Sequence, residues 1–327
     1  QLVSTISQDL SRAIGLHQQG RLHDAIPIYQ SILTRDPVHA DAWHLVGVIA
    51  HQVGRHDEAA QHISRALQVD PENPEFWNNL AAVWLALGRP ETAQECCLHA
   101  LQRRPDFAEA HNHLGLALRQ LGRVPDAIAA YRRALELRPE GAAFHANLAA
   151  AYQEQGELEL ALSHYELSLK LNPQNTSTYF NLSEWVQRGK YSFTQAQLAH
   201  IERLLQSPNL PLQSAIQLCF AAARTLDGRG DFARAFAYFS RGNALRAVLL
   251  AQNHIRFDCL QHADYVARII ATFGQAYFAE MGQSGIASEV PVFIVGMPRS
   301  GTTLVERIVA IHAAIVVAGE RDASPQL

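Results

Sequence analysis

Large side chains recur along the first half of this chain at every thirty-fourth position. Two series follow this period. The first series contains Trp43, Trp77, His111, His145 and Tyr179. The second series contains Tyr29, Ile63, Cys97, Tyr131 and Tyr165. Each period has room for two helices and a turn, and the two series fall in the first and the second helix. The pattern therefore predicts a repeated helix–turn–helix unit.

Small residues and helix breakers repeat with the same period. Three further series are Gly20, Gly54, Gly88, Gly122 and Gly156; Ala25, Ala59, Ala93, Ala127 and Ala161; and Pro37, Pro71, Pro105, Pro139 and Pro173. Glycine ends the first helix because it adopts a left-handed backbone at little cost, and proline ends the second helix because it cannot continue one. The alanine is small where two helices cross closely.

Together these series resemble the tetratricopeptide repeat (TPR) family over about residues 6–175. The resemblance implies five units in residues 1–175, stacked into a right-handed α-solenoid because one unit cannot bury its apolar face alone. Residues 176–255 keep the pattern in part, at Gly230, Ala235 and Phe239, and are expected to cap the solenoid. Residues 256–282 predict an amphipathic helix inside a linker over 256–288. The expected fold is mainly α.

A row of amides is predicted on the concave face of the solenoid, which the first helices would line. The sixth position of successive units holds Leu45, Asn79, His113, Asn147 and Asn181. An asparagine amide can pair with a peptide backbone in both directions. The row is similar to the asparagine ladder in the TPR superhelix of O-linked N-acetylglucosamine transferase, although Leu45 and His113 interrupt it. Binding of a peptide or protein there is one interpretation; the other is that asparagine is simply common at this repeat position.

The stretch PVFIVGMPRSGTT, residues 291–303, reads as a strand, a loop and the start of a helix. Backbone N–H groups of such a loop and the helix N-terminus form an anion site. Gly296 and Gly301 have the spacing of a nucleotide-binding P-loop, but Thr302 stands where a triphosphatase needs lysine. Arg299 is the cation inside the loop, which suits one 5′-phosphate that carries a transferable group.

The stretch "PRSGTT" after a strand resembles the 5′-phosphosulfate loop of the sulfotransferase family, and residues 289–327 would begin an α/β domain of that family, as in bacterial TPR-sulfotransferases and tyrosylprotein sulfotransferases. The resemblance implies 3′-phosphoadenosine 5′-phosphosulfate as donor substrate and a hydroxyl, of tyrosine among other candidates, as acceptor. The donor would contact Arg299, Ser300, Gly301, Thr302 and Thr303. By the same resemblance, Arg299 and Glu320 would be catalytic, with Glu320 as general base, because it stands at the family's offset from the loop arginine.

The family domain normally continues well beyond residue 327, so this chain is expected to be incomplete for catalysis. The alternatives are a TPR scaffold for protein–protein interaction with a catalytically silent C-terminal segment, and a different P-loop transferase.

Composition narrows the partners further. A net charge of −4 with mixed signs favours no nucleic-acid surface. The four cysteines lack paired spacing, which favours a reducing compartment such as the cytoplasm. Sixteen histidines without an HExxH or Cys/His cluster predict no metal site. No stretch is long and apolar enough to predict a membrane helix or a signal peptide.

Overall fold

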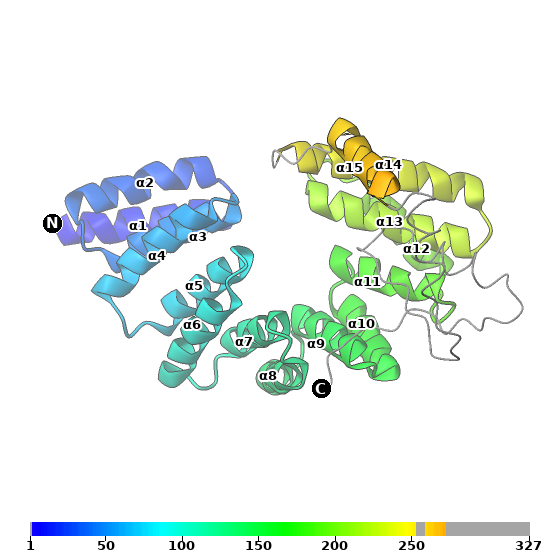
Figure 1. The fold of residues 1–327 in the computed structure, drawn as a ribbon. Helices are drawn as coiled ribbons and strands as arrows, with labels where there is room; N and C mark the ends of the chain where they lie inside the picture. The colour runs from blue at the N-terminus through cyan, green and yellow to red at the C-terminus, as the bar shows by residue number, and fades with distance from the viewer. Residues whose placement is uncertain (1, 253–258, 273–327) are drawn as a thin grey trace, which may run out of the picture. The chain divides into compact units, whose positions relative to one another are not determined.

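The computed structural model describes residues 2–252 and 259–272. The chain divides into two units, residues 1–255 and 256–327, and each is described by itself. In the first unit, α-helices follow one another along a curved array (Figure 1). Residues 6–175 contain helices and turns and no strand, which confirms the predicted α-solenoid.

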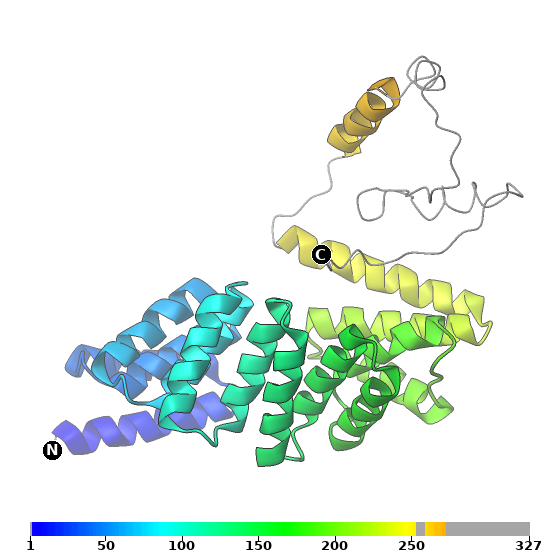
Figure 2. The same ribbon diagram turned by 60° about the horizontal axis from the view of Figure 1, so that its bottom comes forward.

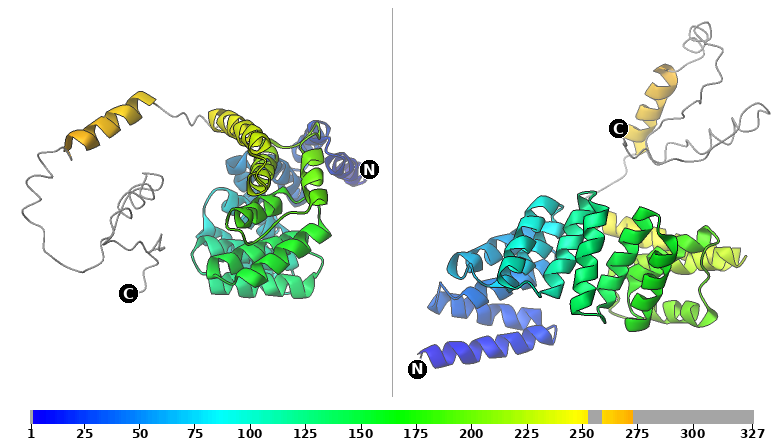
Figure 3. Two further views of the ribbon diagram at one scale, coloured as in Figure 1. Left: turned by 90° about the vertical axis from the view of Figure 1, so that its right-hand side faces the viewer. Right: turned by 90° about the horizontal axis from the view of Figure 1, so that it is seen from below.

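Helices α1 to α10 follow one another as five helix pairs. The first helices are α1 (Leu2–Gln18), α3 (Ala40–Gln52), α5 (Pro74–Ala86), α7 (Ala108–Gln120) and α9 (Ala142–Gln155). The second helices are α2 (Leu22–Arg35), α4 (His56–Val69), α6 (Pro90–Arg103), α8 (Val124–Leu137) and α10 (Leu158–Leu171). Each first helix packs against its own second helix, and from α3 onward also against the second helix of the preceding pair. Helices α5 to α10 stand side by side in Figures 2 and 3.

The turns have the chemistry that the repeated glycines and prolines predict. Each glycine of the series adopts a left-handed backbone, with φ between +68° at Gly88 and +87° at Gly156. The backbone N–H of Gly54 bonds the carbonyl of His51, which is part of the last turn of α3. The repeated prolines come two residues after the last helical residue, as with Pro37 after Arg35. Helix boundaries therefore recur with the period of the sequence, because the residues that set them do.

The core lies between the two layers of helices and is built from small and large residues in contact. Ala25, Ala59, Ala93, Ala127 and Ala161 are all fully buried, as the close crossing of helices requires. Gly115 of α7 faces the buried ring of Tyr131 of α8, and a Cβ added to this glycine would lie 2.5 Å from the ring. Gly47 lies in the same way against Ile63. A small residue on the first helix thus makes room for a large one on the second.

The last helices of the first unit are α11 (Thr176–Gln187), α12 (Gln195–Leu204), α13 (Leu212–Gly228) and α14 (Phe232–Gln252). Helix α11 follows the five pairs in the position of a further first helix, and it packs mainly against α13. Gly230 has φ of +80° and Ala235 is buried, so α13 and α14 keep the turn and the crossing of a TPR pair. Helix α12 was not predicted; Thr194 starts it with a capping box to Gln197.

In the second unit the structure describes helix α15 (Cys259–Thr272), which covers part of the amphipathic helix predicted for residues 256–282. The remainder of that prediction, and the predicted strand, loop and helix of residues 291–327, lie outside the described residues.

The contact at Gly115 yields a prediction. Gly115→Ala should destabilise the protein by about 1–3 kcal/mol, because the new methyl group must displace a buried tyrosine ring. Chemical denaturation measures this loss. Gly15→Ala is the matched control: Gly15 lies inside α1 with nothing within 4 Å of its added Cβ, so the substitution should be neutral or stabilise by about 0.5–1 kcal/mol. An equal effect at both positions would contradict the contact.

Candidate binding site on the concave face

The inner side of the curved array carries the first helices. Figure 1 shows α3, α5, α7, α9 and α11 along this side and α4, α6, α8 and α10 along the outer side. The predicted ladder residues Asn79, His113, Asn147 and Asn181 lie on α5, α7, α9 and α11 respectively, and each is partly buried. The inner side is called the concave face below.

Three of the four ladder residues bond a side chain of the preceding unit. Asn79 Nδ2 donates to His44 Nε2 at 2.7 Å. His113 Nδ1 donates to Asn78 Oδ1, and Asn147 Nδ2 donates to Asn112 Oδ1, both at 2.8 Å. Each bond joins residues 35 positions apart, so the ladder bridges successive first helices. These pairs are called the ladder pairs.

Asn181 has a different partner. Its counterpart in the preceding unit is Ala146, which offers no polar side chain. Asn181 instead hydrogen-bonds the hydroxyl of Tyr165 on α10. That hydroxyl also donates to Gln153 Oε1 at 3.1 Å, and Gln153 accepts a further bond from the Trp185 indole. The last ladder residue is therefore fixed by aromatic side chains of its neighbours.

The sequence reasoning missed the three partners His44, Asn78 and Asn112. They immediately precede the predicted ladder position, and they repeat with the same period as the other series. All three are buried, with 5–8% of each residue exposed. A search for a second polar series next to the first would have found them.

Each ladder pair keeps one further donor and one further acceptor. The bond between Asn147 and Asn112 leaves Asn147 Oδ1 and Asn112 Nδ2 without a partner among the described residues. The bond between His113 and Asn78 likewise leaves His113 Nε2 as acceptor and Asn78 Nδ2 as donor. None of these atoms belongs to the fully enclosed unpaired atoms of the described residues. The concave face thus presents a donor and an acceptor at each of these contacts between successive first helices. These contacts are called joints below.

Burial keeps His44 and His113, the two histidines of the ladder pairs, neutral. It lowers the pKa of His44 to about 4 and the pKa of His113 to about 4. His44 stacks on the Phe76 ring at 4.5 Å between centroids, and Nε2 must stay unprotonated to accept from Asn79. For His113, Glu109 acts against the lowering and His51 adds to it. Protonation of His44 would place N–H against N–H in the ladder pair.

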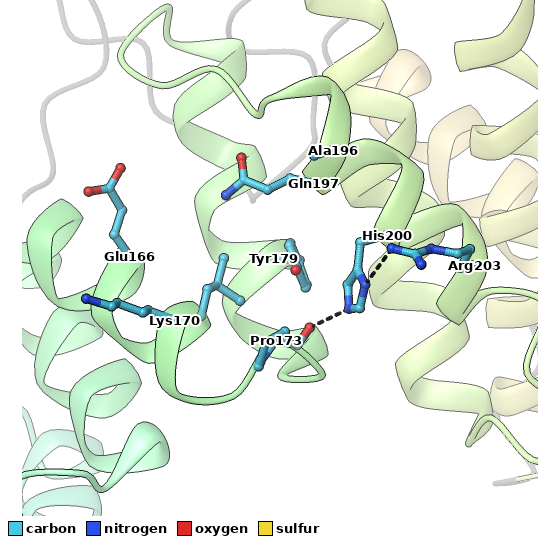
Figure 4. A pocket seen from close by; sticks show the side chains of 9 residues that line it. Glu166, Lys170, Pro173, Tyr179, Ala196, Gln197, His200 and Arg203 are labelled. Atoms are coloured by element: carbon cyan, nitrogen blue, oxygen red, sulfur yellow. Dashed lines mark hydrogen bonds between the residues drawn. The ribbon is translucent and has the colours of Figure 1, made fainter.

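A second series of bonds fixes the proline turns. Trp43, Trp77, His111 and His145 donate from the ring to the carbonyls of Pro37, Pro71, Pro105 and Pro139, at 2.8–2.9 Å. Tyr179 stands next in this series, and Pro173 receives its bond from His200 of α12 instead, at 3.0 Å. Figure 4 shows His200 between Pro173 and Arg203, beside a hollow of about 430 Å³. Helix α12 therefore supplies the donor that the series lacks.

The described residues offer little else for chemistry. Cys96, Cys97 and Cys219 are free and buried, and burial raises the pKa of Cys96 to about 12, so its thiol stays protonated. Within residues 2–252 and 259–272, no three His, Cys, Asp or Glu side chains gather as metal ligands would. None of the described helices combines the length and apolarity that a membrane crossing requires.

The predicted donor and catalytic residues, Arg299, Ser300, Gly301, Thr302, Thr303 and Glu320, lie outside the described residues.

The paired helices, left-handed glycines and ladder pairs define a tetratricopeptide repeat solenoid. Sequence profiles described as tetratricopeptide repeat match residues 10–74, 50–116 and 142–175, and a TPR repeat profile matches residues 115–156. Residues 10–175 of this chain belong to the tetratricopeptide repeat family. A profile described as sulfotransferase family matches residues 291–327.

Known proteins resemble parts of the chain. An uncharacterized protein of Aquifex aeolicus (strain VF5) is 32% identical over 142 residues, which are 43% of this chain and 18% of that protein. TTC0263, a thermophilic TPR protein of Thermus thermophilus, is 22% identical, with a TM-score of 0.47 over 53% of this chain and 94% of that one. MamA from Desulfovibrio magneticus RS-1 is 17% identical, with a TM-score of 0.46 over 52% and 96%.

The buried histidines of the ladder pairs predict that acid lowers the stability of the folded chain. The unfolded chain protonates these imidazoles near their ordinary pKa of 6.5, whereas the folded chain resists protonation until about pH 4. The unfolded state therefore binds more protons between these values, and stability should fall as the pH falls from about 6.5 to about 4, by up to about 3 kcal/mol per histidine. Thermal unfolding across this range measures the effect.

The repeat supplies matched variants for this test. His44→Asn and His113→Asn install the residue that other units carry at the same positions, and each should reduce the pH dependence while the bond is kept. His23→Asn changes an exposed histidine of α2 and should leave the slope unaltered. Burial also lowers the pKa of His51, His62 and His164, so part of the slope should remain. A slope left unchanged by the double variant His44→Asn/His113→Asn would rule out the ladder pairs as a source.

Proposed function

We propose that the concave face binds an extended peptide segment of a partner protein through its backbone. The observation that carries this proposal is the unpaired donor and acceptor at each ladder pair. An extended peptide offers N–H and C=O groups along its edge, and both find complements in such a row. Binding by backbone accepts many side-chain sequences, which is the behaviour expected of a scaffold.

We further propose that the bound segment is the acceptor of a sulfotransferase, whose donor loop includes residues 296–303. The support is the strand, loop and helix predicted from residues 291–303, with Thr302 at the position of the P-loop lysine and Arg299 as the cation of the loop, together with the sulfotransferase profile at residues 291–327. The donor substrate would be 3′-phosphoadenosine 5′-phosphosulfate, held by Arg299 and the N–H and hydroxyl groups of Ser300, Gly301, Thr302 and Thr303. Glu320 would take the proton of the acceptor hydroxyl. A scaffold with a silent C-terminal segment is the alternative.

The peptide proposal predicts a loss of binding in ladder variants. The double variant Asn79→Leu/Asn147→Leu replaces two ladder residues by leucine, the residue found naturally at the equivalent position of an earlier unit, Leu45. It removes the acceptors Asn79 Oδ1 and Asn147 Oδ1. We expect peptides selected from a random library on the wild-type chain to bind this variant about 5–150-fold more weakly, since two hydrogen bonds are worth about 1–3 kcal/mol together. Fluorescence anisotropy measures the affinity.

Two controls separate binding from folding. Gln68→Ala/Gln102→Ala removes two exposed amides of α4 and α6, on the outer side, and should leave affinity unchanged. Methylation of backbone nitrogens in the peptide should weaken binding to the wild-type chain and have less effect on the ladder variant. Unchanged affinity of the ladder variant, with its thermal stability confirmed, would refute the concave face as the site.

The donor-loop proposal has its own test, which needs the natural gene product. Adenosine 3′,5′-bisphosphate should bind in calorimetric titration, and Arg299→Ala should reduce turnover more than this binding, because charge on the leaving oxygen grows in the transition state. Glu320→Gln should lower turnover by about 10²–10⁴-fold with donor affinity kept. Binding of ATP with magnesium in place of the bisphosphate would replace the sulfotransferase by another P-loop activity.

A further inference from the structure

The ladder changes character at its C-terminal end. Ladder pairs join residues 35 positions apart, whereas the bonds between α11 and α13 join residues 41 apart: Thr176 to Gln217, and Ser183 to Arg224. The first helices of this last joint are therefore separated by a longer stretch of chain than those of the earlier joints. Phe180 occupies the position where earlier units carry His44, Asn78 and Asn112. An aromatic ring and an arginine stand there in place of an amide pair.

Arg224 is held in a fixed orientation at this joint. Its guanidinium carbon lies 4.9 Å from the centroid of the Phe180 ring. Its Nη1 donates to Ser183 Oγ at 3.0 Å, and Ser183 Oγ in turn donates to the carbonyl of Phe180 at 2.6 Å. One edge of the guanidinium is thus occupied, and the edge formed by Nε and Nη2 has no partner among the described residues. That edge is the one that takes a carboxylate with two parallel hydrogen bonds.

The charge of Arg224 is only partly balanced. Burial lowers the pKa of its guanidinium, and Glu184 on α11 opposes this lowering by its charge. Arg224 nevertheless takes part in none of the ion pairs of the described residues, unlike Arg119, which pairs with Glu154, or Arg138, which pairs with Glu109. A half-buried cation with free donors gains stability when an anion completes its hydrogen bonds.

The surroundings indicate the kind of anion. Phe220 lies edge-on to Phe180 at 6.5 Å between centroids, and Phe239 follows at 6.1 Å from Phe220; all three rings are partly exposed. These rings suit the short apolar stem of an amino-acid side chain. A single arginine beside Glu184 matches one negative charge better than a dianion such as phosphate. The ligand that fits is the carboxylate of aspartate or glutamate.

We propose that Arg224, held by Phe180 and Ser183, is a carboxylate-binding subsite that selects an acidic side chain of the peptide on the concave face. The proposal rests on the proposed function, because the ladder would hold the backbone while this subsite reads one side chain. It gives the scaffold a sequence preference that backbone contacts alone do not supply.

The test uses peptides selected from a random library on the full 327-residue chain, each made also with its acidic residues replaced by the matching amides. We expect enrichment of Asp or Glu at one position, and a loss of about 10–100-fold in affinity on replacement by the amide. Arg224→Gln should reduce affinity for the acidic peptide by a similar factor and leave the amide peptide unaffected. Arg246→Gln, an exposed arginine of α14, is the matched control and should change neither.

Two further variants distinguish a specific loss of carboxylate binding from a loss caused by misfolding. Glu184→Gln removes the opposing carboxylate and should strengthen binding of the acidic peptide. Arg224→Lys keeps the charge without the two-pronged edge and should show an intermediate loss. Equal affinity of acidic and amide peptides for the wild-type chain, or an equal effect of Arg224→Gln on both, would overturn the subsite. If binding still requires Asn79 and Asn147, the peptide proposal survives that result; if no peptide binds at all, both proposals fail.

Discussion

The contact between each helix pair and the next, in which a second helix packs against the following first helix, holds this solenoid together. A pair of helices cannot bury its own apolar face, so the stability of each pair depends on the pair before and after it. The core follows this rule, because its buried residues form separate clusters along the array rather than a single centre. The ladder pairs lie at the same contact, and they fix how one first helix is aligned with the next. Folding and the candidate site thus depend on the same surface.

Much of the fold could be predicted because the residues that set it act locally. A glycine with positive φ ends a helix whatever lies beyond it, and a proline two residues after a helix prevents its extension. The close approach of Gly115 to Tyr131 follows the same repeat. Helix α12 was missed because the repeat lapses there; its start depends on the capping box of Thr194 and Gln197, a signal carried by one pair of side chains.

The candidate site could be predicted only in part, for a different reason. Asn79, His113 and Asn147 were found from their spacing, but the pattern does not say what they face. The structure shows that each already holds a partner, so the groups available to a ligand are the remaining atoms of a pair. Arg224 was out of reach for sequence reasoning, because its contact with Ser183 depends on the length of chain between α11 and α13. Such a contact becomes visible only when helices are placed in space.

The repetition of one joint has a mechanical consequence. Since every helix pair touches only its neighbours, the path of the array is the product of successive small rotations, one between each pair and the next. A slight change in the angle of a single joint moves the distant end of the array much further than it moves the joint itself, as in a coil spring. The joints of His44 and Asn79, of Asn78 and His113, and of Asn112 and Asn147 use different chemistry, so we expect their stiffness to differ. Bending should therefore concentrate at the softest of them, and a bound peptide that spans two joints would stiffen both.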